Sequence, residues 1–334
     1  MLAHRGAGYL ANRIERLRQL NFVWRSFGDA VAFLYMDRFA LKQTYYSTSN
    51  INPRQDAGFL IGKDGFDAEV TTMEQALAAG IPSLLVDLTN TIRHGDVCFM
   101  VGPDPHLVEV KAGQKLDKRG RRQAKSIKQL HEFFEKDHAV GLRGIPEIRR
   151  VVHQAAERSY VDDINTCIDV AAKQGHAVSN PERGLYYVAM THGGPSIGEV
   201  LREIKAARPL VFSLNEFKSS RAWAPYSPFI LSIRSEAHLY EFLQGRLYVL
   251  VVVDLDVLCA VAAQKGFAAQ LDSDDEEYPL KISKAGQEGQ AAISAHMLRR
   301  IGLEFTSPEW IVDAALEGFD RNVGKPGEAA PVQV

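Results

Sequence analysis

The chain has 334 residues, of which 46% are hydrophobic and 24% are charged, an ordinary balance for a globular protein. Its formal net charge of −2 excludes a generally basic nucleic-acid coat, so any attraction to phosphate has to be local. Three scattered cysteines exclude a disulfide framework and a zinc site. The sequence has no secretory signal and no apolar run of membrane-spanning length, which predicts a cytoplasmic protein that does not span a membrane.

The first third of the chain predicts helices followed by a strand. Residues 9–43 have the periodicity of two helices that separate near Leu20-Asn21, within an N-terminal helical segment 1–45. Breakers between 45 and 65 predict a loop with one short strand near 59–61. A helix is expected over 67–79 and a strand over 83–89, where Asp87 either joins an acidic site or serves as a cap or ion-pair partner.

A strand hairpin with charged residues follows. Strands over 95–101 and 106–111 are joined by a Gly-Pro-Asp-Pro turn at 102–105. Because alternate side chains of a strand share a face, Glu109 and Lys111 project together, and the hairpin brings Asp96 close to them. Such a charged cluster on an apolar sheet is costly unless a divalent cation compensates it. A Glu-x-Lys pair on a half-exposed strand also occurs without any function, so the flanking helices decide the interpretation.

Asp96 followed by Glu109-x-Lys111, with a helix on either side, resembles the PD-(D/E)XK nuclease superfamily, whose fold is restriction-endonuclease-like. The resemblance covers residues 60–155 and implies an α/β fold with a mixed central sheet flanked by helices, in the order helix, three strands, helix, strand. Gly95 stands where the proline of the family name would be. Members of the superfamily often act in bacterial restriction, repair or anti-phage defence, and those contexts are implied by the resemblance alone.

The resemblance also implies a set of roles. Asp96, Glu109 and the Val110 carbonyl would hold Mg²⁺, with Mn²⁺ as a substitute, because hard oxygen ligands suit these ions. Lys111 would orient the attacking water and offset developing negative charge. Glu74, on the upstream helix, would hold a second metal or a water, and Glu69 is the rival candidate for this role.

A basic helix after the hairpin is the second part of the expected site. Residues 119–134 have helical periodicity, with an apolar side of Ile127, Leu130, Phe133 and Phe134. The cations expected to bind nucleic-acid phosphates are Lys115, Lys118, Arg119, Arg121, Arg122, Lys125 and Lys128. Gln123 occupies a position where many superfamily members carry a substrate-contacting glutamine. A merely solvated basic helix is the alternative.

The second half predicts an α+β companion domain or elaboration over 158–322, after a nuclease domain over 1–157 and before a disordered tail at 323–334. The expected helices are 162–174, 197–206, 291–300 and 308–317, and the expected strands are 145–153, 184–191, 210–214, 229–233 and 247–255. A homodimer or a partner protein bound through residues 158–322 stays open.

The sequence therefore predicts a Mg²⁺-dependent nuclease that hydrolyses DNA, in preference to RNA. The first alternative is a catalytically inactive nucleic-acid-binding scaffold in a larger complex. The second is a phosphatase that uses Asp254 and Asp256, which end an apolar strand but lack the Gly-Thr that follows in haloacid-dehalogenase-like enzymes.

Overall fold

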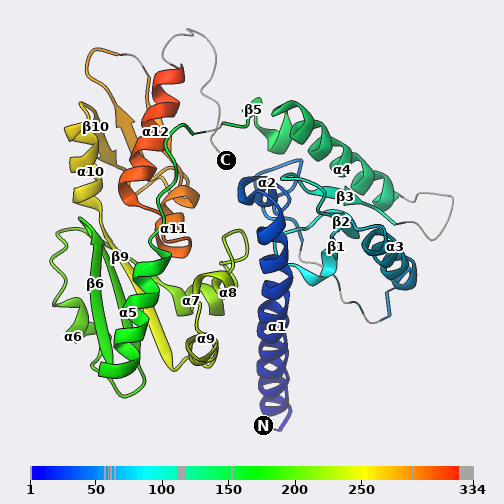
Figure 1. The fold of residues 1–334 in the computed structure, drawn as a ribbon, viewed down its shortest axis with the longest axis horizontal. Coiled ribbons are helices and arrows are strands. Elements are labelled where there is room, and N and C mark those ends of the chain that lie inside the picture. The colour runs from blue at the N-terminus through cyan, green and yellow to red at the C-terminus, as the bar shows by residue number, and fades with distance from the viewer. Residues whose placement is uncertain are drawn as a thin grey trace. The chain divides into compact units, whose positions relative to one another are not determined.

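The computed structural model describes residues 2–55, 58, 60, 62–63, 65–110, 118–151, 153–287 and 289–322 (Figure 1). The chain divides into two units. The first holds Met1–Val151 and Arg221–Ile230, and the second holds Val152–Ser220 and Leu231–Ala330. The break at 151 lies close to the predicted 157, whereas the return of 221–230 to the first unit has no counterpart in the sequence prediction. The predicted tail at 323–334 lies outside the described residues.

The first unit combines helices with short antiparallel strands. Its helical elements are α1 (Leu2–Tyr35), α2 (Arg38–Gln43), α3 (Phe66–Ala78), α4 (Lys118–Lys136) and the 3-10 turns η1 (Val86–Leu88) and η2 (Leu142–Gly144). Its strands are β1 (Ser83–Leu85), β2 (Val97–Phe99), β3 (His106–Val108), β4 (His138–Val140) and β5 (Glu147–Arg149). The predicted helices at 67–79 and 119–134 and the predicted hairpin are confirmed as α3, α4 and β2–β3.

The sheet differs from the one expected. Strands β1, β2 and β3 form an antiparallel sheet in that order, and β4 pairs with β5 in a separate antiparallel sheet. The segment 145–153 therefore contributes β5 to a hairpin and does not add a strand to a mixed central sheet. The coarse prediction of a protein built from helices and strands holds, while a restriction-endonuclease-like core is not shown.

The predicted helix break near Leu20-Asn21 is wrong. Helix α1 runs unbroken from Leu2 to Tyr35, and the chain turns at Asp37 instead. The Asp37 carboxylate accepts a hydrogen bond from the Ala40 amide at 2.9 Å and so caps α2. Leu20-Asn21 contains no comparable stop signal, since neither residue breaks a helix strongly.

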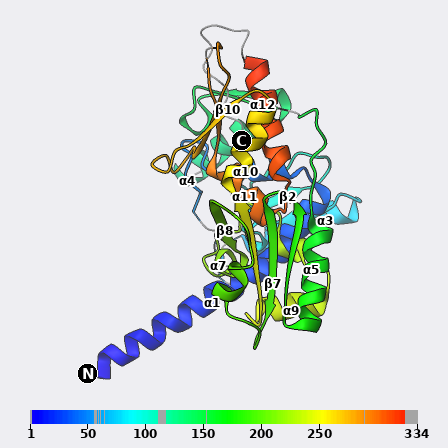
Figure 2. The ribbon, with the colours of Figure 1, turned by 90° about the vertical axis from the view of Figure 1, so that its left-hand side faces the viewer.

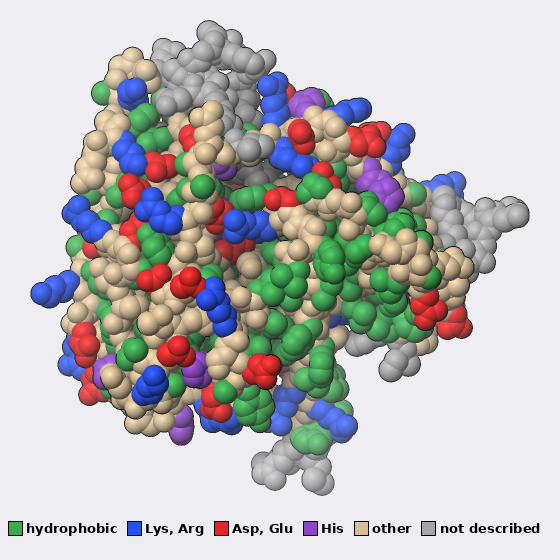
Figure 3. Space-filling view, in the orientation of Figure 1, with side chains coloured by type: hydrophobic (Ala, Val, Ile, Leu, Met, Phe, Trp, Pro, Cys, Tyr) green, Lys and Arg blue, Asp and Glu red, His purple; other side chains and the backbone are tan. Residues whose placement is uncertain are grey.

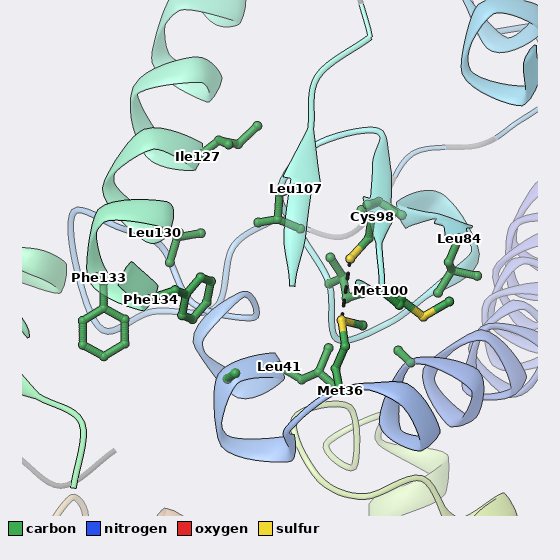
Figure 4. Close-up of a cluster of buried hydrophobic side chains, with 14 of the residues drawn as sticks. Met36, Leu41, Leu84, Cys98, Met100, Leu107, Ile127, Leu130, Phe133 and Phe134 are labelled. Carbon is green, nitrogen blue, oxygen red and sulfur yellow. Dashed lines mark hydrogen bonds between the residues drawn. The ribbon is translucent and has the colours of Figure 1, made fainter. Parts of the chain in front are cut away.

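An apolar core holds α4 against the sheet. Figure 4 shows Ile127, Leu130 and Phe134 of α4 on the side that faces Leu107 of β3. Cys98 of β2 continues the same core, which also takes in residues of α1 and α2. Burial of this predicted apolar side leaves the basic side of α4 in solvent.

Helix α1 is fastened to the segment that carries η1. A Cβ atom at Gly28 would lie 2.1 Å from the Leu88 carbonyl oxygen, so only glycine permits this close approach. At the next position, the buried Asp29 carboxylate accepts hydrogen bonds from the amides of Asn90 and Thr91 at 2.9 and 2.8 Å. Burial raises the pKa of Asp29 to about 6 in spite of these hydrogen bonds. The contacts hold Asp87, which lies in η1, in a defined place.

The second unit is built on two antiparallel sheets (Figure 2). The larger has the order β6 (His176–Glu182), β7 (Leu185–Thr191), β9 (Leu247–Asp254), β8 (Pro209–Ser213), and the smaller joins β10 (Ala268–Leu271), β11 (Leu280–Ser283) and β12 (Ala291–Ile293). The helices are α5 (Val161–Gln174), α6 (Ile197–Leu201), α7 (Leu214–Ser219), α9 (Glu236–Leu243), α10 (Leu255–Gln264), α11 (Ala295–Leu303) and α12 (Pro308–Asn322).

Most elements predicted for the second half are confirmed, with two corrections. The segment predicted as a strand at 229–233 forms the short helix α8 (Phe229–Ser232), because a five-residue apolar run has no decisive period. The predicted helix at 291–300 is a strand, β12, followed by α11 from Ala295. The described part of the chain contains no helix that combines the length and apolarity needed to span a bilayer.

Candidate functional site

Asp96 and Glu109 lie at the end of the β2–β3 hairpin, as the strand pattern predicts. The Asp96 amide donates to the Val108 carbonyl at 2.8 Å, and the Val110 amide donates to the Asp96 carboxylate at 3.0 Å. Gly95 has a φ of 81°, and a Cβ atom there would lie 2.9 Å from the Val108 oxygen. Proline, whose φ is fixed near −65°, cannot adopt this conformation. The departure from the family motif at this position therefore has a local structural reason.

Three carboxylates converge on the ammonium group of Lys63. Its Nζ lies 2.7 Å from Asp87, 2.9 Å from Glu69 and 3.3 Å from Asp96. The Lys63 side chain is 26% exposed, and the three carboxylate side chains are between 5% and 13% exposed. Water screens such contacts far less than it screens ion pairs at the surface. The loop before α3, the first turns of α3, η1 and the end of β2 thus meet at one charged cluster.

Burial is the main cause of the raised pKa values of Glu69 and Glu109, and the charges of neighbouring acids add to it. Burial, followed by the charge of Asp96, raises the pKa of Glu109 to about 7. Burial also raises the pKa of Glu69, although Lys63 donates a hydrogen bond to it. Burial lowers the pKa of Lys63, but its hydrogen bonds to Asp87 and Glu69 outweigh this effect and raise it above the usual value. One ammonium therefore does not balance the acids around it.

Glu109 connects this cluster to the basic helix. Its Oε2 atom is buried and has no hydrogen-bond partner among the described residues. The charges of Arg54 and Lys63 and a hydrogen bond with Gln123 of α4 lower its pKa, but by less than burial raises it. Arg54 in turn donates to the Gln123 side-chain oxygen at 3.2 Å. Gln123 thus lies beside the Glu109 carboxylate.

The structure brings together some of the expected site residues and leaves out others. Glu69 is buried in the cluster, whereas Glu74, the residue preferred from the sequence, is exposed on α3. Asp87 forms an ion pair with Lys63, the interpretation favoured from the sequence, and through this pair it also belongs to the acidic cluster. Lys111 and Lys115 lie outside the described residues, as do two of the three positions of the strand expected at 59–61.

Lys63 is the residue that the sequence interpretation missed. It lies in the segment Gly62-Lys63-Asp64-Gly65, whose glycines indicate a loop and carry no sign of a buried charge. Its three contacts span 6, 24 and 33 positions along the chain. Because the three partners lie that far along the chain, no local pattern in the sequence indicates this cluster.

The cations of α4 form an exposed row. Lys118, Arg121, Arg122, Lys125 and Lys128 are exposed, and Arg119 lies on the same helix. Only one of them has an ion pair among the described side chains, between Lys128 and Glu132 at 3.7 Å, and such exposed pairs contribute little. The row is therefore available to an anionic ligand.

The donor set fits a divalent cation in its chemistry. Asp96, Asp87, Glu69 and Glu109 offer hard carboxylate oxygens, which Mg²⁺ prefers, and the buried Glu109 Oε2 has no described partner. Among the described residues, no three Asp, Glu, His or Cys side chains lie so that they could bind one metal ion together. In this cluster, Lys63 Nζ lies between three of the carboxylates. A cation that bound here would have to displace the ammonium.

The acids of the phosphatase alternative have structural roles. Asp254 is 6% exposed and accepts hydrogen bonds from the amides of Ala207, Arg208 and Asp256 at 2.9, 3.2 and 3.1 Å. It caps α10 and ties the end of β9 to the neighbouring loop. Asp256 is exposed and lies 3.3 Å from Arg208. A carboxylate that accepts three backbone hydrogen bonds is poorly placed to act as a nucleophile.

Comparison with protein-family models, with curated proteins and with solved structures finds no match. The function is therefore inferred from the site itself.

Proposed function

We propose that the first unit is a Mg²⁺-dependent nuclease that hydrolyses phosphodiester bonds of DNA. The observation that carries the proposal is the group of four carboxylates at the end of the β2–β3 hairpin, with more negative charge than Lys63 balances. Gln123 and the exposed cations of α4 lie on the next helix, so an acidic centre and a phosphate-binding surface adjoin.

The residues have distinct roles in this proposal. Asp96 and Glu109 hold the metal, and Glu69 replaces Glu74 as the supporting acid because it is the one buried in the cluster. The metal supplies charge stabilisation at the phosphoryl oxygens and lowers the pKa of a bound water. Exposed Arg121, Arg122 and Lys125 bind backbone phosphates, and Lys111 keeps the water-orienting role that the motif assigns to it.

One observation favours a second candidate, a nucleic-acid-binding scaffold without chemistry. Lys63 Nζ already lies within 3.3 Å of three carboxylates and neutralises part of the charge that a metal would neutralise. A chain that had lost catalysis would be stabilised by such an internal ammonium. The scaffold binds DNA or RNA with a steep salt dependence and does not cut either.

Incubation of the pure protein with supercoiled plasmid, linear DNA and RNA separates the two candidates. The nuclease cuts DNA with Mg²⁺ or Mn²⁺ and stops when a chelator is added. Asp96→Asn and Lys111→Ala should abolish cutting, while Asp67→Asn, an exposed acid on α3, should leave it unchanged. Binding without any metal-dependent cutting contradicts the nuclease proposal and supports the scaffold.

A matched pair of variants tests the supporting acid. Glu69→Gln and Glu74→Gln change the same functional group on the same helix, one buried in the cluster and the other exposed. Glu69→Gln should reduce cutting strongly and Glu74→Gln should have no effect. The opposite pattern restores the assignment made from the sequence. Circular dichroism spectra of both variants show whether each is folded.

A further inference from the structure

Helix α1 carries an exposed apolar stripe. Its members, called the α1 seam from here on, are Leu10, Leu17, Leu20, Trp24, Phe27, Val31 and Leu34, which are 57%, 57%, 52%, 65%, 42%, 40% and 70% exposed. Green side chains line this helix near the grey N-terminal atoms in Figure 3. A contiguous apolar patch of this extent on a protein surface marks a binding surface.

The spacing of the α1 seam is that of a coiled coil. Leu10, Leu17, Trp24 and Val31 repeat every seven residues, and Leu20, Phe27 and Leu34 repeat every seven residues three positions later. These are the a and d positions of a heptad pattern, in which Arg13 is the one d position that is not apolar. Exposed Tyr9, Ile14 and Tyr35 lie at the adjoining g and e positions and widen the apolar stripe beside the seam.

The opposite side of α1 is already used. Phe22, Ser26, Asp29, Ala32 and Met36 are buried in the first unit, so the seam is not the side that fastens the helix. Residues 8–18 are exposed throughout, and this half of α1 extends away from the rest of its unit, apart from an exposed ion pair between Glu15 and Arg221 (Figure 2). Helical segments of this length are marginal in water without packing. The projecting half therefore needs a partner along the seam.

We propose that the α1 seam binds a second copy of this chain in an antiparallel helix pair, an inference that does not depend on the nuclease proposal. Arg13 decides the direction. In a parallel pair, Arg13 would face Arg13 of the second chain at a d layer, where two like charges are destabilising. In an antiparallel pair centred near Phe22, Arg13 faces Val31, and its alkyl stem packs there while its charge reaches solvent.

The antiparallel pairing also matches the remaining side chains. Leu10 faces Leu34, Leu17 faces Phe27, and Leu20 faces Trp24, so all layers except the one with Arg13 are apolar on both sides. Each projecting half then lies along the anchored half of the other copy. The seam extends for roughly 37 Å at 1.5 Å per residue. Fourteen half-exposed side chains cover on the order of 1,000 Å² of apolar area, which is near the lower range of stable interfaces.

Sedimentation equilibrium of the full chain tests the pairing. The wild-type protein should be a dimer at micromolar concentration. Leu17→Glu and Leu20→Glu should each raise the dimer dissociation constant by roughly a hundredfold, since each puts one unpaired charge into each of two symmetry-related layers. Val140→Glu, at a position that is 76% exposed outside α1, is the matched control and should not change the assembly. A wild-type monomer, or a dimer that survives both seam variants, overturns the proposal.

Disulfide trapping tests the direction. Cys98 and Cys167 are buried, so a Cys259→Ser background removes the one partly exposed thiol. A mixture of Leu10→Cys and Leu34→Cys proteins should form a disulfide between the two variants upon oxidation. Self-linking of the Leu10→Cys protein alone indicates a parallel pair and refutes the antiparallel assignment.

A monomer that binds anionic vesicles through α1 assigns the seam to a membrane surface and overturns the dimer.

Discussion

Replacement of Lys63 by methionine tests the charge balance of the acidic cluster. The change keeps an unbranched side chain of similar length and removes the ammonium that lies 2.7–3.3 Å from Asp87, Glu69 and Asp96. Three carboxylates, each at most 13% exposed, are then left without their shared cation. Repulsion among them should destabilise the first unit.

The magnitude follows from the burial of the group. Removal of one partner from a fully buried ion pair costs about 3–5 kcal/mol. Because Lys63 retains 26% of its exposure, we expect a smaller loss, about 2–3 kcal/mol after solvent screening is allowed for. For a unit of this size, such a loss lowers Tm by roughly 5–10 °C. Mg²⁺ should reverse most of it, since a ligand at a hundred times its Kd stabilises by about 2.7 kcal/mol.

Thermal unfolding in chelator and in millimolar Mg²⁺ measures both effects. Lys63→Met should gain more from Mg²⁺ than the wild-type protein, in which the cation has to displace the ammonium. Lys128→Met is the control, because that lysine is 78% exposed and its one ion pair among the described residues is a weak, exposed contact of 3.7 Å with Glu132. Equal Tm values for Lys63→Met and wild type in chelator, or equal gains from Mg²⁺, would refute the idea that Lys63 and a divalent cation compete for one place.

Three further changes test other parts of the structure. Burial raises the pKa of Glu109 from 4.5 to about 7, so without metal the folded state binds the extra proton and stability should fall as pH rises through this window. Metal binding near pH 7 should release about half a proton from Glu109, seen by calorimetry in two buffers, and Glu109→Gln should release less. Arg300→Ala removes the buried guanidinium that pairs with Glu157 and Glu304 and should cost about 3–5 kcal/mol in urea unfolding, so an unchanged midpoint contradicts this account. Gly28→Ala forces a Cβ against the Leu88 carbonyl and should lower the free energy of unfolding by about 1–3 kcal/mol. Gly8→Ala on the same helix meets no other atom and should stabilise the helix. Equal effects at both sites would speak against close packing at Gly28.

Local patterns were sufficient for the elements around the site. The Gly-Pro-Asp-Pro turn and the alternating strands predicted the β2–β3 hairpin, and the apolar period of residues 119–134 predicted both α4 and its buried side. The proximity of Asp96 to Glu109 followed from the hairpin alone. These features depend on residues that are near one another in the chain, so their geometry is set by backbone preferences and by the period of each element.

The choice between Glu69 and Glu74 needed more than a local pattern. The two residues are five positions apart, which places them on nearly opposite sides of a helix, so only one can face the sheet. Glu69 shares its side of α3 with Ala76, seven positions later, and both are buried. Which side of a helix packs inward is decided by its neighbours, and the weak amphipathicity of α3 left both acids as candidates.

The amino-acid sequence was enough to predict helices α3 and α4, the β2–β3 hairpin, the pair of acids at its end and the basic side of α4. Each of these features depends on spacing within a short segment. Only the tertiary structure placed Lys63 among three carboxylates, returned residues 221–230 to the first unit and paired β4 with β5 away from the first sheet. Those outcomes depend on which distant surfaces bury the most apolar area and which buried charges find a partner, and no spacing within one segment encodes them.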